Sequence, residues 1–417
     1  MHRILLFLAV IGPGLITAFS GNDAGGIATY TVAGASFGYR QLWALLVAAL
    51  GMIVINEMSA RMGAVTGKGL SDLIREQFGV RWTLFAMSAL LIANTATTVA
   101  NVAGLAASAE ILGARLPPVA HWLVARAVSV PLLVAAVWLL ITRTGYRAVE
   151  RAFLGFTVIF VSYIIAGFAA HPSWETVVAT MFVPSRQWLA ADAQFIRVVI
   201  AIIGCTIAPW MQFYLQSSTV EKGIHEAQFR MARVDVVTGA VAANIIAVFI
   251  VVAAAVRLHP AGAAVTTADQ AALALEPVAG AYASLLFAVG LFGASMLAAA
   301  VVPLSTAYAV CEAFGWESGL DRRLGEAPRF FGIFTGVLII SAVPTVIPRA
   351  PLIDLMVLSQ VVNGCLLPVI LVFMLLLVNR PSIMGARVNS RLHNAIAWGV
   401  AGVIMGLIAA MLVVEFA

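Results

Sequence analysis

Long apolar runs dominate the chain, and this feature constrains its fold more than any other. Hydrophobic residues make up 62% of the 417 positions and charged residues only 10%, with a mean hydropathy of +1.01. Soluble domains carry about 25% charged residues. Because lipid offers no partner to backbone N–H and C=O groups, a run of about 20 apolar residues crosses a bilayer as a helix. The sequence therefore predicts an all-α polytopic membrane protein.

Eleven such spans can be counted along the chain. They are expected at residues 4–36, 41–62, 82–109, 119–142, 150–170, 194–219, 234–256, 279–311, 330–348, 353–378 and 393–416. No segment between them is long or polar enough to form a separate soluble domain. We therefore expect residues 1–417 to form a single transmembrane domain.

The basic residues predict which ends of the spans face the cytoplasm. With the N-terminus inside, 17 of the 24 Lys and Arg residues fall on the inner side. This asymmetry favours a cytoplasmic N-terminus and an outer C-terminus, in what we expect to be a bacterial inner membrane. The net charge of +5 follows this distribution and indicates no nucleic-acid partner.

One acidic residue lies within the first span. Asp23 stands in the run Gly-Asn-Asp-Ala-Gly-Gly at residues 21–26. An ionised carboxylate at bilayer depth is costly and marks a functional site, and the glycines disfavour continuous helix. Irregular backbone is tolerated in a membrane only where it is packed in protein or lines a polar cavity. The run predicts an unwound segment that carries a cation site.

A second interruption is predicted in the span 194–219. Pro209 lies deep in this span, where proline removes one backbone hydrogen bond and crowds the preceding turn. By the count of spans, this helix opens a second group of five, as the first span opens the first group. Interrupted helices at corresponding positions predict an inverted-repeat transporter with its site at the midplane. The repeats are expected at about 1–171 and 192–379, followed by an extra helix at 393–416.

Several short runs resemble the natural resistance-associated macrophage protein (NRAMP) family of divalent-metal transporters. They are residues 33–39 (AGASFGY), 59–63 (SARMG), 65–68 (VTGK), 214–218 (YLQSS) and 358–362 (LSQVV). The similarity spans nearly the whole chain. It implies a leucine-transporter-like fold with two inverted five-helix repeats, an eleventh helix, and breaks in helices 1 and 6. It also implies a divalent cation as substrate.

The resemblance implies a metal site in which several ligands have changed. The family's Asp-Pro-Gly-Asn motif reads Asp-Ala-Gly-Gly here, so Asp23 keeps the carboxylate while Gly26 replaces the asparagine ligand. The family's Ala-x-x-Met-Pro-His motif begins at Cys205, whose carbonyl oxygen would be a ligand. In this motif Ala208 replaces the methionine and Trp210 replaces the histidine.

Two residues of the tenth span belong to the same predicted site. The resemblance implies an amide ligand at Gln360, and the neighbouring Asn363 is a further candidate. For Asn363 we favour interhelical hydrogen bonding over metal binding.

The third span also departs from the family's pattern. The family's Ala-Thr-Asp-x-Ala-Glu motif reads Ala-Thr-Thr-Val-Ala-Asn here, with Thr98 and Asn101 in place of the two acids. A proton relay needs groups that titrate, and neither of these residues nor Trp210 titrates near neutral pH. The sequence predicts cation uptake without proton coupling and resembles the NRAMP-related magnesium transporter branch.

The changed ligands predict a hard cation. Soft sulfur ligands select transition metals, whereas carboxylate, carbonyl and water suit Mg²⁺ and Mn²⁺. Ala208 removes the thioether, and Gly26 removes a side-chain oxygen and is expected to add room. Because Mg²⁺ dehydrates reluctantly, we expect a partly hydrated Mg²⁺ beside Asp23, with Mn²⁺ also open.

Two other transport functions stay open at this stage. One is a proton-coupled Mn²⁺ or Fe²⁺ transporter with a degenerate site. The other is a sodium-coupled organic-solute carrier of the same fold, in which Asp23 binds an amine. An enzyme is not expected, because the sequence shows no metal-binding histidine pair, nucleophile–base set or phosphate loop. No cofactor and no obligatory protein partner are predicted besides the metal substrate and the lipid bilayer.

Overall fold

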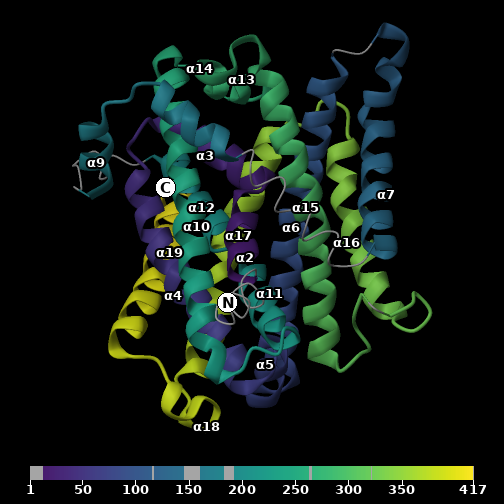
Figure 1. Cartoon of the computed structure of the whole chain (residues 1–417), viewed down its shortest axis with the longest axis vertical. Coiled ribbons are helices and arrows are strands. Elements are labelled where there is room, and N and C mark those ends of the chain that lie inside the picture. Colours follow the sequence, from purple (N-terminus) through teal and green to yellow (C-terminus); the bar gives the residue numbers. More distant parts are fainter. Residues whose placement is uncertain are drawn as a thin grey trace, which may run out of the picture.

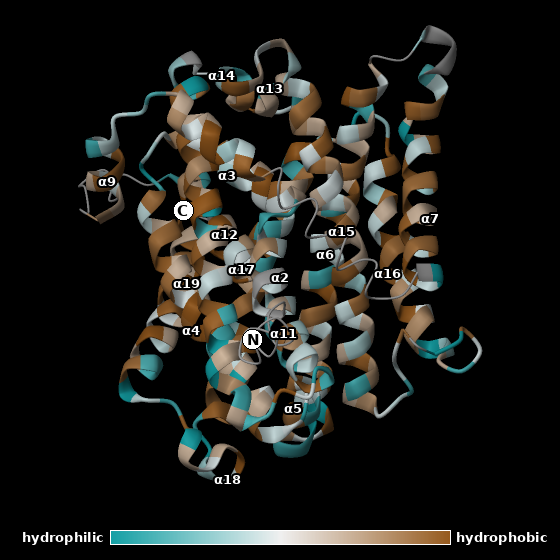
Figure 2. Ribbon diagram, in the orientation of Figure 1, coloured by the Kyte–Doolittle hydropathy of each residue, from teal (hydrophilic) through white to brown (hydrophobic). Residues whose placement is uncertain are grey.

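The fold is built from helices that run in both directions across the molecule (Figure 1). The computed structural model describes residues 13–114, 117–144, 160–182, 192–262, 265–320 and 322–416, and these ranges contain helices but no strand. Within them, nine helices are long and apolar enough to cross a membrane. Figure 2 shows apolar residues along these helices and hydrophilic residues gathered near their ends. The predicted all-α membrane fold is confirmed.

The helices that make up the predicted spans occupy the positions that the apolar runs predicted. They are α2 (Pro13–Phe19), α3 (Ala24–Phe37), α4 (Leu42–Thr66), α6 (Val80–Gly113), α7 (Arg126–Thr144), α10 (Ala193–Thr206), α11 (Pro209–Glu221), α12 (Phe229–Arg257), α15 (Ala283–Phe314), α16 (Pro328–Val346), α17 (Leu352–Val378) and α19 (Arg391–Phe416). Residues 4–12 of the first predicted span and residues 150–159 of the fifth lie outside the described residues. Within the rest of the fifth span, Phe160–Ala169 is an apolar helix.

Two differences from the predicted spans change the local structure. The fourth span, expected from residue 119, begins with a 3-10 segment, η2 (Pro118–Val124), and its α-helix starts only at Arg126. Ala125 between them has extended backbone, so the two helical segments do not join. In the first span the break is shorter than predicted, because η1 (Ser20–Asn22) and Asp23 form it while Gly25 and Gly26 already belong to α3.

The sequence analysis missed the short helices between the spans. They are α5 (Leu70–Phe78), α9 (Trp174–Phe182), α13 (Ala268–Ala272), α14 (Glu276–Ala279) and α18 (Pro381–Met384). A search for apolar runs of about 20 residues passes over elements of 4 to 9 residues. The amphipathic α5 is fixed to the bundle by the Ser71 hydroxyl, which donates to Glu312 Oε2 of α15 at 2.7 Å.

The two interrupted helices lie together at the centre of the bundle. Helix α10 packs against η1, α3 and α17, and α12 packs against α2, α3 and α4. Helices α7 and α16 stand at one side of the molecule, and α4 and α19 at the other (Figure 1). The central position surrounds both breaks with protein, which is where irregular backbone is tolerated in a membrane.

Paired glycines bring α10 and α17 into backbone contact. A Cβ on Gly204 of α10 would overlap the Gln360 carbonyl oxygen and lie 2.5 Å from the Gly364 nitrogen of α17. A Cβ on Gly364 would lie 2.5 Å from the Ile200 carbonyl oxygen of α10. Small residues allow such close helix approach within membranes. This contact places the middle of α17 beside the end of α10.

Replacing the buried glycine tests this contact. We expect Gly364→Leu to push the helices apart and to lower stability by about 1–3 kcal/mol, as overpacking does. Gly399→Leu on α19 is the matched control, because a Cβ on Gly399 would meet no atom within 4 Å. Thermal unfolding of the purified variants in detergent measures the difference. Equal melting temperatures for both variants would contradict the close packing.

Candidate functional site

Asp23 is the residue that ends the break in the first span. Its backbone is extended (φ −71°, ψ −172°), and it is the N-cap of α3. Its Oδ1 accepts a hydrogen bond from the Gly26 N–H at 2.9 Å, and its Oδ2 accepts one from Asn101 Nδ2 at 2.7 Å. The residue is only 4% exposed. The carboxylate therefore uses the free N–H groups and the positive end of α3 as its first stabilising partners.

Asn101 of α6 forms hydrogen bonds with both the Asp23 side chain and the backbone at the start of α3. Its Nδ2 donates to Asp23 and to the Thr97 carbonyl oxygen at 2.9 Å, while its Oδ1 accepts from the Ala24 N–H at 3.3 Å. The sequence placed Asn101 on the pathway, and the structure places it in direct contact with Asp23. A neutral amide here avoids a second negative charge beside the carboxylate, where like charges at close range repel strongly.

A chain of hydrogen bonds links Asn101 to α17 through Thr97. Asn363 Nδ2 donates to Thr97 Oγ1 and to Gln360 Oε1, both at 2.8 Å. The predicted interhelical role of Asn363 agrees with these contacts. The Gln360 side chain then ends against Gly25 of α3, where a Cβ would overlap the amide nitrogen. This nitrogen is buried and has no hydrogen-bond partner among the described residues. Gln360 thus presents unused hydrogen-bonding capacity beside the cap.

The second break follows from Pro209. Helix α10 ends at Thr206, Ala208 has extended backbone (φ −67°, ψ 142°), and Pro209 is the first residue of α11. An uninterrupted helix would satisfy the Cys205 carbonyl with the N–H of residue 209, and proline has none. A Cβ on Gly21 would lie 3.0 Å from this carbonyl oxygen. The two breaks therefore face each other, with the Cys205 carbonyl against η1.

Two residues that were not predicted from the sequence contact the breaks, Tyr30 by joining the two interrupted helices and Gln212 within the second break. The Tyr30 hydroxyl of α3 lies 3.1 Å from Thr206 Oγ1 of α10. The Gln212 amide, one turn into α11, faces the carbonyl oxygens of Ala208 at 3.0 Å and Pro209 at 2.8 Å. The amide orientation that satisfies both carbonyls is the one in which its nitrogen donates to them. The position of Gln212 four residues after Ala208 was the only available signal for its contact with the break.

The space expected at Gly26 is not open. A Cβ on Gly26 would overlap the Gly21 carbonyl oxygen, so backbone of the break occupies the place of a side chain. The expectation that glycine adds room at this position was wrong for this conformation. The reason is that η1 folds back over the first turn of α3. Residue 26 contributes a backbone donor to Asp23 and no side-chain ligand.

Two further candidates are buried within the bundle. The Thr98 hydroxyl donates to the Asn94 carbonyl oxygen of α6 at 2.7 Å. The Trp210 ring is 1% exposed and packs edge-on against Tyr214 of α11, with the ring centroids 5.8 Å apart. These contacts are those of packed structural residues.

The donors at the site are oxygen-rich and carry one negative charge. The described part of the chain holds no group of three or more His, Cys, Asp and Glu residues that would bind a metal ion. The site instead gathers the Asp23 carboxylate, amide side chains and a backbone carbonyl. Carboxylate and carbonyl oxygens suit hard cations. Two interrupted helices that meet at such a site define the class of secondary transporters with discontinuous helices.

Comparison with known proteins identifies the family. The model of the natural resistance-associated macrophage protein-like family matches residues 14–414, so the chain belongs to this family. A divalent metal cation transporter MntH of Deinococcus radiodurans is 30% identical over 422 residues, covering 98% of this chain and 89% of the relative. One from Acidiphilium cryptum is 30% identical over 412 residues, covering 96% of this chain and 89% of the relative.

Solved structures share the fold. A manganese transporter of Eremococcus coleocola superposes with a TM-score of 0.73 at 22% identity, covering 96% of this chain and 85% of that chain. MhsT in complex with L-phenylalanine gives a TM-score of 0.64 at 16% identity, covering 96% of this chain and 98% of that chain. The predicted leucine-transporter-like fold is confirmed.

The cap can be tested apart from the charge. Asp23→Ala removes the acceptor for two donors, whereas Asp23→Asn keeps an acceptor oxygen. Because losing an N-cap costs about 0.5–2 kcal/mol, we expect Asp23→Ala to unfold at a lower temperature than Asp23→Asn. Thermal unfolding in metal-free detergent solution measures this. The cap assignment fails if the alanine variant is as stable as the asparagine variant.

Proposed function

We propose that this protein mediates uptake of divalent cations, with partly hydrated Mg²⁺ as the preferred ion, without proton coupling. Its family membership and the names of its relatives support divalent-metal transport. The observation that carries the finer proposal is the neutral surrounding of Asp23. Asp23 accepts hydrogen bonds from the neutral amide of Asn101 and from the backbone N–H of Gly26, and residue 208 is an alanine without sulfur.

In this proposal Asp23 supplies the charge that holds the ion. A carboxylate has about four acceptor sites, and the Gly26 N–H and Asn101 use two of them. The others are free for a cation or its water. The Cys205 carbonyl contributes from the opposite break. If the Gln360 and Asn363 amides both rotate by 180°, the hydrogen bond between them is kept with donor and acceptor exchanged, and the Gln360 oxygen lies where the unpartnered nitrogen now lies. Asn101 acts as a positioning residue that orients the carboxylate.

The preference for Mg²⁺ rests on the chemistry of these groups. Carboxylate, amide and carbonyl oxygens bind hard cations, and Mg²⁺ keeps several of its waters where few direct ligands are offered. Ala208 presents a methyl group where the family carries a thioether. Mn²⁺ is hard enough to use the same oxygens and is the expected second substrate.

The proposed absence of proton coupling follows from the groups around Asp23. A relay passes protons between titratable side chains, and the network from Asn101 through Thr97 and Asn363 to Gln360 contains none. Membrane potential then drives uptake. An inside-negative potential favours a divalent cation by about 4.6 kcal/mol per 100 mV, twice the value for one charge.

We also propose that transport occurs by alternating access, with residues 1–171 and 192–379 as inverted repeats, 393–416 as an added helix, and the N-terminus in the cytoplasm. A polar cluster closes one end of the bundle. Arg61 of α4 lies 3.3 Å from Glu57 Oε2 and donates to the Arg387 carbonyl oxygen at 2.6 Å. Glu57 Oε1 lies 3.9 Å from Arg233 of α12. Opening a path to the cytoplasm would require this cluster to separate.

Reconstitution tests the proposal. We expect the purified chain alone, in proteoliposomes with an inside-negative potential, to take up Mg²⁺ while internal pH stays constant. Asp23→Asn should abolish uptake, and Glu175→Gln, at an exposed acid of α9, should leave it unchanged. Internal Mg²⁺ and pH dyes record both quantities in one experiment. Mn²⁺ uptake accompanied by protons, with no Mg²⁺ uptake, would return the chain to a proton-coupled Mn²⁺ or Fe²⁺ transporter.

Restoring the sulfur tests the selectivity. We expect Ala208→Met to increase Cd²⁺ uptake relative to Mg²⁺ by roughly tenfold or more, since a thioether ligand favours soft ions. Ala208→Leu, which adds similar bulk without sulfur, is the matched control. Competition of Cd²⁺ with Mg²⁺ uptake in proteoliposomes gives the ratio. An equal ratio in all three proteins would show that residue 208 does not set the preference.

A further inference from the structure

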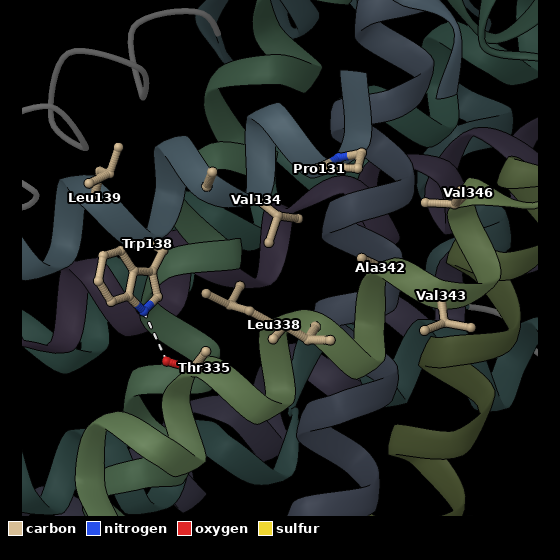
Figure 3. A pocket seen from close by; sticks show the side chains of 11 residues that line it. Pro131, Val134, Trp138, Leu139, Thr335, Leu338, Ala342, Val343 and Val346 are labelled. Carbon is tan, nitrogen blue, oxygen red and sulfur yellow. Dashed lines mark hydrogen bonds between the residues drawn. The ribbon is translucent and has the colours of Figure 1, made fainter. Parts of the chain in front are cut away.

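A cavity of about 770 Å³ lies between α7 and α16, away from the two breaks (Figure 3). Its lining includes Pro131, Trp138 and Leu139 of α7, and Thr335, Ala342 and Val346 of α16. The two helices pack antiparallel, because the start of α7 meets the end of α16 and Trp138 faces Thr335. Ligand cavities in proteins fall in the same range of about 300–1,000 Å³.

The lining offers no free polar group. Thr335 is the one residue with a side-chain hydroxyl in the described lining, and Trp138 carries the one side-chain N–H. The indole Nε1 donates to Thr335 Oγ1 at 2.9 Å, and that hydroxyl donates to the Phe331 carbonyl oxygen at 2.7 Å. Both polar groups are thus satisfied within the protein. The interior of the cavity suits a hydrocarbon chain and gives a polar molecule nothing to bind.

The two helices stand where lipid is the solvent. Only 28% of the apolar stretch of α7 and 39% of that of α16 is buried in the protein. Both helices lie at one side of the bundle in Figure 1. Ile339 and Val343, which line the cavity, are 58% and 62% exposed. The cavity is therefore open toward the acyl chains of the bilayer.

Positive charge lies at one end of the cavity. Arg143 is exposed in the last turn of α7, one turn beyond the lining residue Leu139, and Arg329 is exposed in the first turn of α16. The Arg329 guanidinium lies 4.6 Å from the centre of the Trp316 ring. Neither arginine has an acidic partner among the ion pairs between described residues. At the other end, Arg126 is paired with Glu110 at 2.5 Å.

We propose that this cavity binds one acyl chain of an anionic phospholipid from the bilayer, with the lipid phosphate held by Arg143 and Arg329. The apolar interior accommodates the chain, and the two guanidinium groups, which have no acidic partner among the described residues, complement the phosphate at the end where the helices leave the membrane. Basic residues between transmembrane helices on the cytoplasmic side recognise anionic headgroups in this way. The site is separate from the cation site and does not depend on the transported ion.

Trp138 provides a direct probe, because bromine atoms on an acyl chain quench tryptophan fluorescence only on contact. The full chain is reconstituted in phosphatidylcholine that contains a small fraction of brominated phosphatidylglycerol or, separately, brominated phosphatidylcholine. Subtracting the quenching of a Trp138→Phe variant isolates the signal of Trp138. We expect this signal to be several-fold larger with the anionic brominated lipid.

Matched variants locate the two parts of the lipid. The double variant Arg143→Gln with Arg329→Gln should make the quenching by the two brominated lipids equal. Arg349→Gln, beyond the opposite end of α16, should keep the stronger quenching by the anionic lipid. Ala342→Phe should fill the cavity and remove most Trp138 quenching. Ile340→Phe, on the same helix but outside the lining, should not. Size-exclusion chromatography checks that each variant is folded and monodisperse.

Three results would overturn the proposal. Equal quenching by both lipids in the unsubstituted protein would mean ordinary solvation by bulk lipid. Absence of Trp138-dependent quenching would mean that another occupant, such as a second copy of the chain, covers the cavity. Loss of the anionic preference in Arg349→Gln alone would place the phosphate at the opposite end.

Discussion

The contact on which the site depends is that between the Asp23 carboxylate and the start of α3. The two carboxylate oxygens accept from the Gly26 N–H and from Asn101, so one side chain both begins a helix and places a negative charge at the first break. A buried carboxylate is tolerated only where such donors offset its lost hydration. The same two contacts leave acceptor sites open on its oxygens. The start of α3 and the proposed cation binding therefore both rest on Asp23.

The second break and the packing of α17 complete the site around this residue. Pro209 leaves the Cys205 carbonyl without its helical donor, and Gly21 of η1 lies against that carbonyl. The glycine contact between α10 and α17 brings Gln360 to the first turn of α3. Each polar group thus comes from a different helix, which is the arrangement that the proposed alternating access needs if the ion is to be released when helices separate.

Much of this architecture could be predicted from the sequence because its causes are local. Apolar runs fixed the spans, and Asp23 and Pro209 marked both breaks. The rest depends on how distant segments pack. The cap shortened the first break, and the Gly21 carbonyl filled the space expected at Gly26. The contact of Gln212 with the second break depends on side-chain placement within α11, which no apolar pattern encodes.

The most direct test of the account is the position of a bound ion. Mn²⁺ scatters anomalously and binds the same oxygen ligands as Mg²⁺, so crystals grown with Mn²⁺ reveal where the site lies. We expect one anomalous peak between the Asp23 carboxylate and the Cys205 carbonyl, weakened by added Mg²⁺ and absent in Asp23→Asn. A peak elsewhere in the protein, or one that persists without the carboxylate, would contradict it.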